Sequence, residues 1–192
     1  VFSAVDNAPE NETVSGIANG KFFVLKEDME WVIGRTTEKI VVPKGFVTDY
    51  ASIPKLLWDK GLEPRGWYDR ASIIHDYLYW SQGCTRAHAD RLMVIAMKEC
   101  NVGTIDGFLI YTALDKFGEL AWDSNAKAKS EGKPKVLPNK YLTPQDPNMK
   151  WEDYRKEMIK LGVKDPAFPK NPSYCKYGNT TEVPSKNIEN VE

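Results

Sequence analysis

Short runs rich in apolar and β-branched residues near the start of the chain predict strands. Three such runs lie at residues 21–26, 29–34 and 39–42, and a proline ends the last of them. The polar pair Glu27-Asp28 separates the first two runs and predicts a turn. We therefore expect a small antiparallel sheet in which the run at 21–26 pairs with the run at 29–34.

From residue 66 the apolar positions recur every three to four residues, a spacing typical of helices. The pattern predicts helices at about 66–80, at 85–100 with Thr85 as the N-cap, and at 104–126. The first two are separated only by residues 81–84, and so short a connection favours an antiparallel helix hairpin. The positions expected to face the core are Trp67, Ala71, Ile74 and Leu78 in the first helix, Ala89, Leu92 and Ala96 in the second, and Phe108, Tyr111, Leu114, Phe117 and Trp122 in the third.

These elements predict an α+β fold with three parts. Residues 1–18 are polar and patternless, and they are expected to form an arm. Residues 19–126 are expected to hold a small N-terminal antiparallel sheet and a three-helix core that contains the hairpin. Residues 127–192 are expected to form an irregular C-terminal extension with one short helix at 151–161, because the three prolines at 166–172 preclude regular structure beyond it.

Composition and charge exclude several classes of protein. The net charge of −1 gives no sign of a nucleic-acid-binding face. No run approaches the roughly 18 to 20 apolar residues of a membrane span, and a start without Met predicts a processed or trimmed N-terminus. The three cysteines, Cys84, Cys100 and Cys175, fit one disulfide plus a free thiol or three free thiols.

The candidate chemistry is concentrated on the helix hairpin. The first helix is expected to end at Trp80, and His75 lies five residues before that end. Asp90 lies five residues after Thr85, where the second helix is expected to begin. At a rise of about 1.5 Å per residue, both lie about 7 to 8 Å from the connection, where their side chains can meet. Tyr79 follows His75 by one turn on the same face. The pair fits a structural core histidine, a metal ligand, or a catalytic base whose tautomer is fixed by the carboxylate.

Two further carboxylates and three further side chains complete the candidate site. Asp76 points about 100° away from His75, which fits a surface carboxylate or a metal ligand. Asp49 lies in a turn-rich loop and fits a local cap or an oxygen ligand for the same metal. The candidate substrate-binding residues, which would contact a phosphate or carboxylate unless they are solvated or paired elsewhere, are Arg70, Tyr68 and Arg91.

The sequence His75-Asp76-x-x-Tyr79, followed by Ala89-Asp90-Arg91 on the next helix, resembles the paired catalytic helices of secreted phospholipase A2. The resemblance covers about 35 residues, and that family's glycine-rich calcium loop and flanking cysteines are missing. It implies that His75 is a general base, that Asp90 orients it and that Tyr79 supports Asp90. It also implies Ca²⁺ at Asp76, which Asp49 could help to hold.

A longer stretch, about residues 20–122, resembles an uncharacterised domain family of phages and bacteria. The residues that carry this resemblance are Gly45-Phe46-x-Thr48-Asp49-x-Ala51-Ser52-Ile53-Pro54, Arg70-Ala71 and His75-Asp76-Tyr77-Leu78-Tyr79, then Ala89-Asp90 and Ala96-Met97. It implies a phage or secreted bacterial context and assigns no chemistry.

Together these patterns lead us to expect a secreted, periplasmic or virion-associated hydrolase of phospholipid esters, with the membrane surface as its partner. A peptidoglycan hydrolase acting on the cell wall is one alternative. The other is a non-enzymatic binding module of a phage or secretion apparatus. In that module the His75–Asp90 pair would be structural. An immunity protein or a phage structural protein is a further candidate partner.

Overall fold

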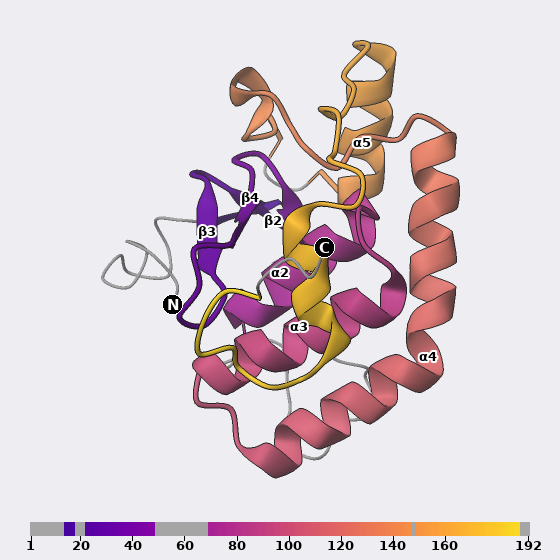
Figure 1. Cartoon of the computed structure of the whole chain (residues 1–192). Helices are drawn as coiled ribbons and strands as arrows, with labels where there is room; N and C mark the ends of the chain where they lie inside the picture. The colour runs from indigo at the N-terminus through magenta and orange to yellow at the C-terminus, as the bar shows by residue number, and fades with distance from the viewer. Residues whose placement is uncertain (1–13, 18–21, 49–68, 147–148, 189–192) are drawn as a thin grey trace.

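The computed structural model describes residues 14–17, 22–48, 69–146 and 149–188, and it confirms the α+β fold (Figure 1). Two small antiparallel sheets form from the N-terminal part of the chain, and helices pack beside them. One core cluster includes buried residues of both sheets and of the three long helices, among them Trp31, Ile74, Leu92 and Ile110. No helix of the described residues is long and apolar enough to cross a membrane.

The expected pairing of the first two strands is wrong, because the strands belong to different sheets. β2 (Phe22–Leu25) pairs with β1 (Val14–Ile17) on one edge and with β5 (Val47–Thr48) on the other. Both edges of β2 are therefore occupied. β3 (Met29–Val32) pairs with β4 (Lys39–Val42) in the second sheet. The segment predicted as a polar arm thus contributes a strand.

The helix hairpin is present as predicted. α2 (Asp69–Ser81) and α3 (Arg86–Glu99) pack against each other, and the Thr85 hydroxyl caps α3 by accepting from the backbone N–H of His88 at 3.2 Å. Every residue of α2 from 71 to 81 is buried, so α2 is a central helix and not a one-sided surface helix. Polar side chains on α2 therefore need partners inside the fold.

The third long helix differs from its predicted pattern. α4 (Thr104–Ser130) runs four residues further than expected, and it changes direction partway along (Figure 1). Leu114 is buried, but the side chains of Phe108 and Phe117, which were expected to face the core, are 66% and 53% exposed. The buried residues of α4 are confined to one narrow face made by Ile110, Ala113, Leu114 and Gly118.

The C-terminal extension is more regular than its prolines suggested. α5 (Trp151–Lys160) forms the expected short helix and packs in a second cluster with Val24, Val47 and Leu137. Two 3-10 helices, η3 (Asn139–Tyr141) and η4 (Ser173–Asn179), were not predicted. Each begins directly after a proline, where a proline is compatible with a helix because its missing N–H needs no partner.

Two polar contacts, one from α4 and one from the C-terminal extension, hold these segments to the end of α2. The Trp80 indole N–H donates to Asp165 at 2.6 Å, and Lys129 donates to the carbonyl oxygens of Trp80 and Ser81 at 2.9 Å each. Lys129 thus satisfies carbonyls that the last turn of a helix leaves without intrahelical partners. Desolvation of the Lys129 ammonium lowers its pKa.

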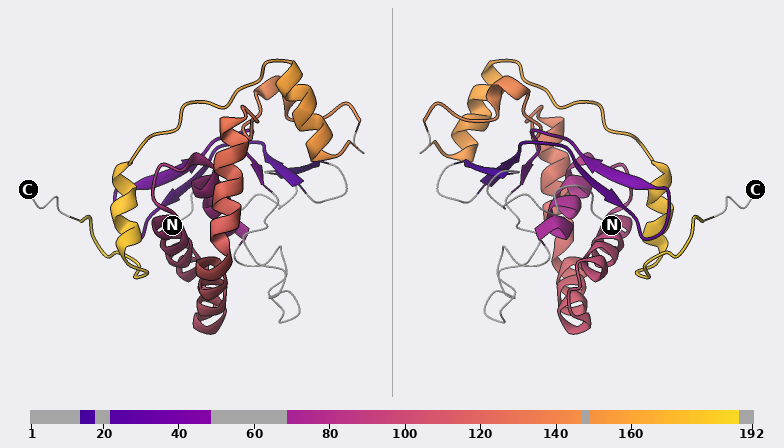
Figure 2. Two further views of the ribbon diagram at one scale, coloured as in Figure 1. Left: turned by 90° about the vertical axis from the view of Figure 1, so that its right-hand side faces the viewer. Right: turned by 90° about the vertical axis from the view of Figure 1, so that its left-hand side faces the viewer.

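The fold is closed covalently by a disulfide between Cys84 and Cys175, which links the α2–α3 connection to η4 across 91 residues of sequence. Cys100 is free and half-buried, and burial raises the pKa of its thiol to about 11. Of the two arrangements that the sequence left open, the structure shows one disulfide and one thiol. Figure 2 shows η4 and α5 at opposite margins of the molecule, joined by an extended segment.

We expect Cys175→Ser to lower the free energy of unfolding by about 4 kcal/mol, because a cross-link of this span removes much entropy from the unfolded chain. Urea unfolding under non-reducing conditions measures the difference. Cys100→Ser is the matched control and should leave the transition midpoint nearly unchanged. Equal midpoints for the Cys175 variant and the wild type would contradict a stabilising disulfide.

Candidate active site

The Asp90 carboxylate is the centre of the candidate site. One of its oxygens, Oδ1, lies 2.9 Å from His75 Nε2 and accepts a hydrogen bond from the Tyr79 hydroxyl at 2.6 Å. The side chains of His75 and Asp90 are each only 2% exposed. The predicted meeting of these three residues is confirmed, and it follows from their positions along the hairpin.

The contacts of Asp90 fix the tautomer of His75. A carboxylate that accepts from Tyr79 has no proton to give, so the short contact with His75 requires the ring proton on Nε2. In the neutral ring, Nδ1 is then the basic nitrogen. The rings of His75 and Tyr79 lie one helical turn apart with centroids 4.1 Å from each other, which limits rotation of the imidazole.

Arg86 completes the coordination of Asp90. Its Nη1 donates to Asp90 Oδ2 at 3.0 Å and to the carbonyl oxygen of Leu114 in α4 at 3.3 Å. The Arg86 side chain is 25% exposed, so it joins the buried carboxylate to the protein surface. Both oxygens of Asp90 are therefore hydrogen-bonded and its charge is balanced, as burial of a carboxylate requires.

α4 forms a wall against the Tyr79 side of the site. The backbone at Gly118 approaches Tyr79 so closely that a Cβ there would lie 2.3 Å from the Tyr79 hydroxyl oxygen. Trp122 packs edge-on against the Tyr79 ring with centroids 5.2 Å apart. Burial, and secondarily the Asp90 charge, raises the pKa of Tyr79, so Tyr79 keeps its proton and remains a hydrogen-bond donor.

Asp76 lies on a different side of α2, as its helical phase predicted. It is buried rather than at the surface, and its Oδ2 accepts a hydrogen bond from the Thr48 hydroxyl at the end of β5. Its proposed partner in metal binding, Asp49, lies outside the described residues. Ca²⁺ takes six to eight oxygen ligands, and the described residues contain no group of three or more His, Cys, Asp or Glu side chains that could hold a metal. Those residues alone do not fit a calcium site.

Two of the three predicted substrate-binding residues, Arg70 and Arg91, lie among the described residues and have contacts elsewhere in the fold. Arg91 donates to the carbonyl oxygen of Gly178 at 3.2 Å and so holds η4 against α3. Arg70, at the start of α2, acts electrostatically on the Cys100 thiol beyond the end of α3. Tyr68 lies outside the described residues. A substrate role for these residues stays a prediction.

Sequence reasoning missed several residues that build the site. Arg86 stands four residues before Asp90, a spacing that pairs opposite charges on a helix, and this signal was available. Thr48 carried no comparable signal, because its contact with Asp76 joins a strand to a helix 28 residues away. Gly118 interrupts a long helical pattern, but Gly107 does so too with nothing within 4 Å of its Cβ position, so neither glycine by itself signals the contact with Tyr79.

The fold and the site define a class: an α+β domain in which a helix hairpin holds a buried His–Asp pair. Among known families, residues 23–114 match the model of a family described as a protein of unknown function, DUF1353. The match includes both sheets except β1, both helices of the hairpin, and α4 as far as Leu114. No curated protein and no solved structure matches the chain.

We expect Gly118→Ala to destabilise the fold by about 1–3 kcal/mol, because the new methyl group must displace Tyr79 from Asp90. Thermal or urea unfolding measures the change. Gly107→Ala is the control in the same helix, since nothing lies within 4 Å of its Cβ position. That variant should gain about 0.5–1 kcal/mol from helix propensity. A stabilised Gly118→Ala protein would contradict the close packing of α4 on Tyr79.

The raised pKa of Tyr79 predicts a loss of stability in alkali. Above pH 10 the unfolded chain releases this proton while the folded protein retains it, so the free energy of unfolding falls as pH rises. Tyr79→Phe should reduce that fall by up to about 1.4 kcal/mol per pH unit. Urea unfolding between pH 9 and 11 compares the two proteins, which share the other buried tyrosines. Parallel pH profiles would show that Tyr79 titrates normally.

Proposed function

We propose that the protein is a hydrolase in which His75, oriented by Asp90, activates water. The observation that carries the proposal is the complete hydrogen bonding of Asp90 by His75, Tyr79 and Arg86. An oriented imidazole with a fixed tautomer is the arrangement that general base catalysis requires. The carboxylate also stabilises the imidazolium that forms when the ring takes a proton.

The proposed reaction has two proton transfers. His75 Nδ1 takes a proton from water as the oxygen attacks the carbonyl carbon of an ester, and a tetrahedral oxyanion forms. The protonated ring, held by Asp90, then gives its proton to the leaving alkoxide as the carbon–oxygen bond breaks. Tyr79 and Arg86 take no part in bond making, and they keep Asp90 charged and in position.

Phospholipid esters are the substrate class that we propose. The support is the resemblance of the helix pair to secreted phospholipase A2, together with the contact of Tyr79 with Asp90 that this resemblance led us to expect. Ca²⁺ at Asp76 belongs to the same proposal. Because the described residues do not make a calcium site, the steps above involve no metal.

A secreted, periplasmic or virion-associated location is also proposed. The Cys84–Cys175 disulfide supports it, because disulfides persist in oxidising compartments. The resemblance to a domain family of phages and bacteria supports the same setting.

The depth of His75 favours a second candidate function. A side chain that is 2% exposed meets little solvent, and a catalytic base must reach both water and substrate. In the second candidate, the protein is a non-enzymatic binding module and the His75–Asp90 pair links α2 to α3. Removing either partner of such a buried pair destabilises a protein by about 3–5 kcal/mol.

The decisive variants are His75→Ala and Asp90→Asn. If the hydrolase is correct, His75→Ala should reduce fatty-acid release from phosphatidylglycerol vesicles at least 100-fold, because a general base contributes about that much or more. His88→Ala is the matched control, since His88 bonds to Asn179 at 3.1 Å, away from the pair, and its activity should be unchanged. Circular dichroism at the assay temperature confirms that each variant is folded.

Three outcomes separate the candidates. If a folded His75→Ala protein released fatty acid as fast as the wild type, His75 would not be the general base. Release of fragments from purified sacculi, with no lipid hydrolysis, would replace the lipid by peptidoglycan. A lower melting temperature in both variants, with no activity in the wild type on either substrate, would favour the binding module.

A further inference from the structure

The near-zero net charge of the chain conceals a strong separation of charge. Residues 127–176 hold 12 Lys and Arg against 6 Asp and Glu, while the rest of the chain holds 14 against 21. The basic stretch lies wholly outside residues 23–114, which match the family model. It includes α5 and most of the extension that packs on the hairpin.

The lysines of this stretch are available at the surface. Six are exposed and make no ion pair among the described residues: Lys127, Lys140, Lys150, Lys160, Lys164 and Lys170. Two of the acidic residues, Glu131 and Asp153, are already paired with neighbouring lysines at 2.6 and 2.9 Å. The six remaining lysines therefore leave the stretch with an excess of positive charge at the surface.

Apolar side chains stand among these lysines at the end of α5. Ile159 is 40% exposed and Leu161 is 59% exposed, and they flank Lys160. Lys164 follows Leu161 by three residues. We define the basic tip as Ile159, Lys160, Leu161 and Lys164. α5 ends at Lys160, and Gly162 just beyond it has a left-handed backbone conformation. The four side chains therefore lie at the junction between α5 and the extended segment that follows.

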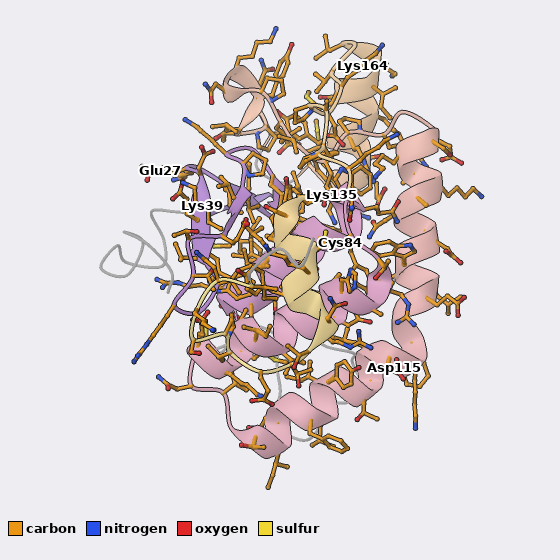
Figure 3. All side chains as sticks on the ribbon, in the orientation of Figure 1. Glu27, Lys39, Cys84, Asp115, Lys135 and Lys164 are labelled. Atoms are coloured by element: carbon orange, nitrogen blue, oxygen red, sulfur yellow. A yellow bond between two sulfur atoms is a disulfide. The ribbon has the colours of Figure 1, made fainter. Side chains whose placement is uncertain are left out.

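The basic tip projects from the body of the molecule. α5 and the first half of α4 lie at opposite ends in all three views (Figures 1 and 2). Figure 3 shows Lys164 at the end that carries α5 and Asp115 away from it, near the bend of α4. The exposed apolar residues of α4, which include Phe108 and Leu120, are accompanied by Asp115, Lys116 and Glu119, so carboxylates outnumber lysines among these neighbours. An anionic partner is therefore favoured at the tip over this part of α4.

We propose that the basic tip docks the protein on an anionic phospholipid bilayer. Lysines attract an anionic lipid surface, and aliphatic side chains among them can enter the headgroup boundary. The composition of the tip favours lipid over nucleic acid, because it offers no arginine and no aromatic side chain for bases. This inference rests on the proposed lipid substrate, since docking brings the hydrolase to the membrane surface that contains the phospholipid esters.

The experiment measures vesicle binding in the His75→Ala protein, so that binding is separated from turnover. Co-sedimentation compares vesicles of phosphatidylcholine alone with vesicles of equal parts phosphatidylcholine and phosphatidylglycerol. We expect binding only to the second kind, and its loss as salt rises from about 0.1 M to about 1 M, where the Debye length falls from about 10 Å to about 3 Å.

Variants of the tip locate the surface. Lys160→Gln with Lys164→Gln should weaken binding about 30-fold, because each lysine near an anionic membrane is worth roughly fivefold in affinity. Leu161→Ser should weaken binding at low salt, because it removes an apolar contact, and should leave the steepness of the salt dependence unchanged. The control pair, Lys44→Gln with Lys116→Gln, removes two exposed lysines from the acidic remainder of the chain and should change nothing.

Four results would overturn the inference. These are equal binding to both kinds of vesicle, no binding at low salt, equal losses in the tip and control variants, and binding to double-stranded DNA without binding to vesicles. Hydrolysis of a soluble short-chain phospholipid by the wild type tests the proposed function separately. Activity on that substrate without vesicle binding would refute the docking surface and leave the hydrolase standing.

Discussion

The buried carboxylate of Asp90 is the constraint on which the centre of this structure depends. An ionised group at 2% exposure is tolerated only with close compensation, and three helices provide it. α2 contributes His75 and Tyr79, α3 contributes Arg86, and α4 supplies the carbonyl that holds Arg86 in place. The same contacts that make the burial possible fix the imidazole, so the stability of the hairpin and the proposed chemistry share one set of hydrogen bonds.

The rest of the chain closes around the hairpin. The disulfide ties the α2–α3 connection to η4, and Arg91 and Lys129 satisfy backbone carbonyls of the C-terminal extension and of the end of α2. The part that matches the family model ends at residue 114, before the wall of α4 that packs on Tyr79. Gly118 and Trp122 therefore lie outside the matched range.

The sequence predicted the features that depend on local periodicity and missed those that depend on distant contacts. Helical spacing and the short connection were sufficient to bring His75, Tyr79 and Asp90 together. The same periodicity failed for Phe108 and Phe117, because only a narrow face of α4 meets the core. The predicted strand pairing was wrong because β1 and β5 occupy the two edges of β2, and no local pattern shows those contacts. η4 was not predicted because proline disrupts the interior of a helix, although it is well suited to the position just before one.

The central claim is that Asp90 holds His75 as the tautomer with its proton on Nε2. Long-range ¹⁵N–¹H correlation spectra of the imidazole rings test this directly, since the chain has two histidines and His88→Ala assigns their signals. We predict that the neutral imidazole of His75 in the folded protein carries its proton on Nε2. Asp90→Asn should change the proportion of the two tautomers. A neutral His75 with its proton on Nδ1 would contradict the hydrogen bond to Asp90 and the role proposed for it.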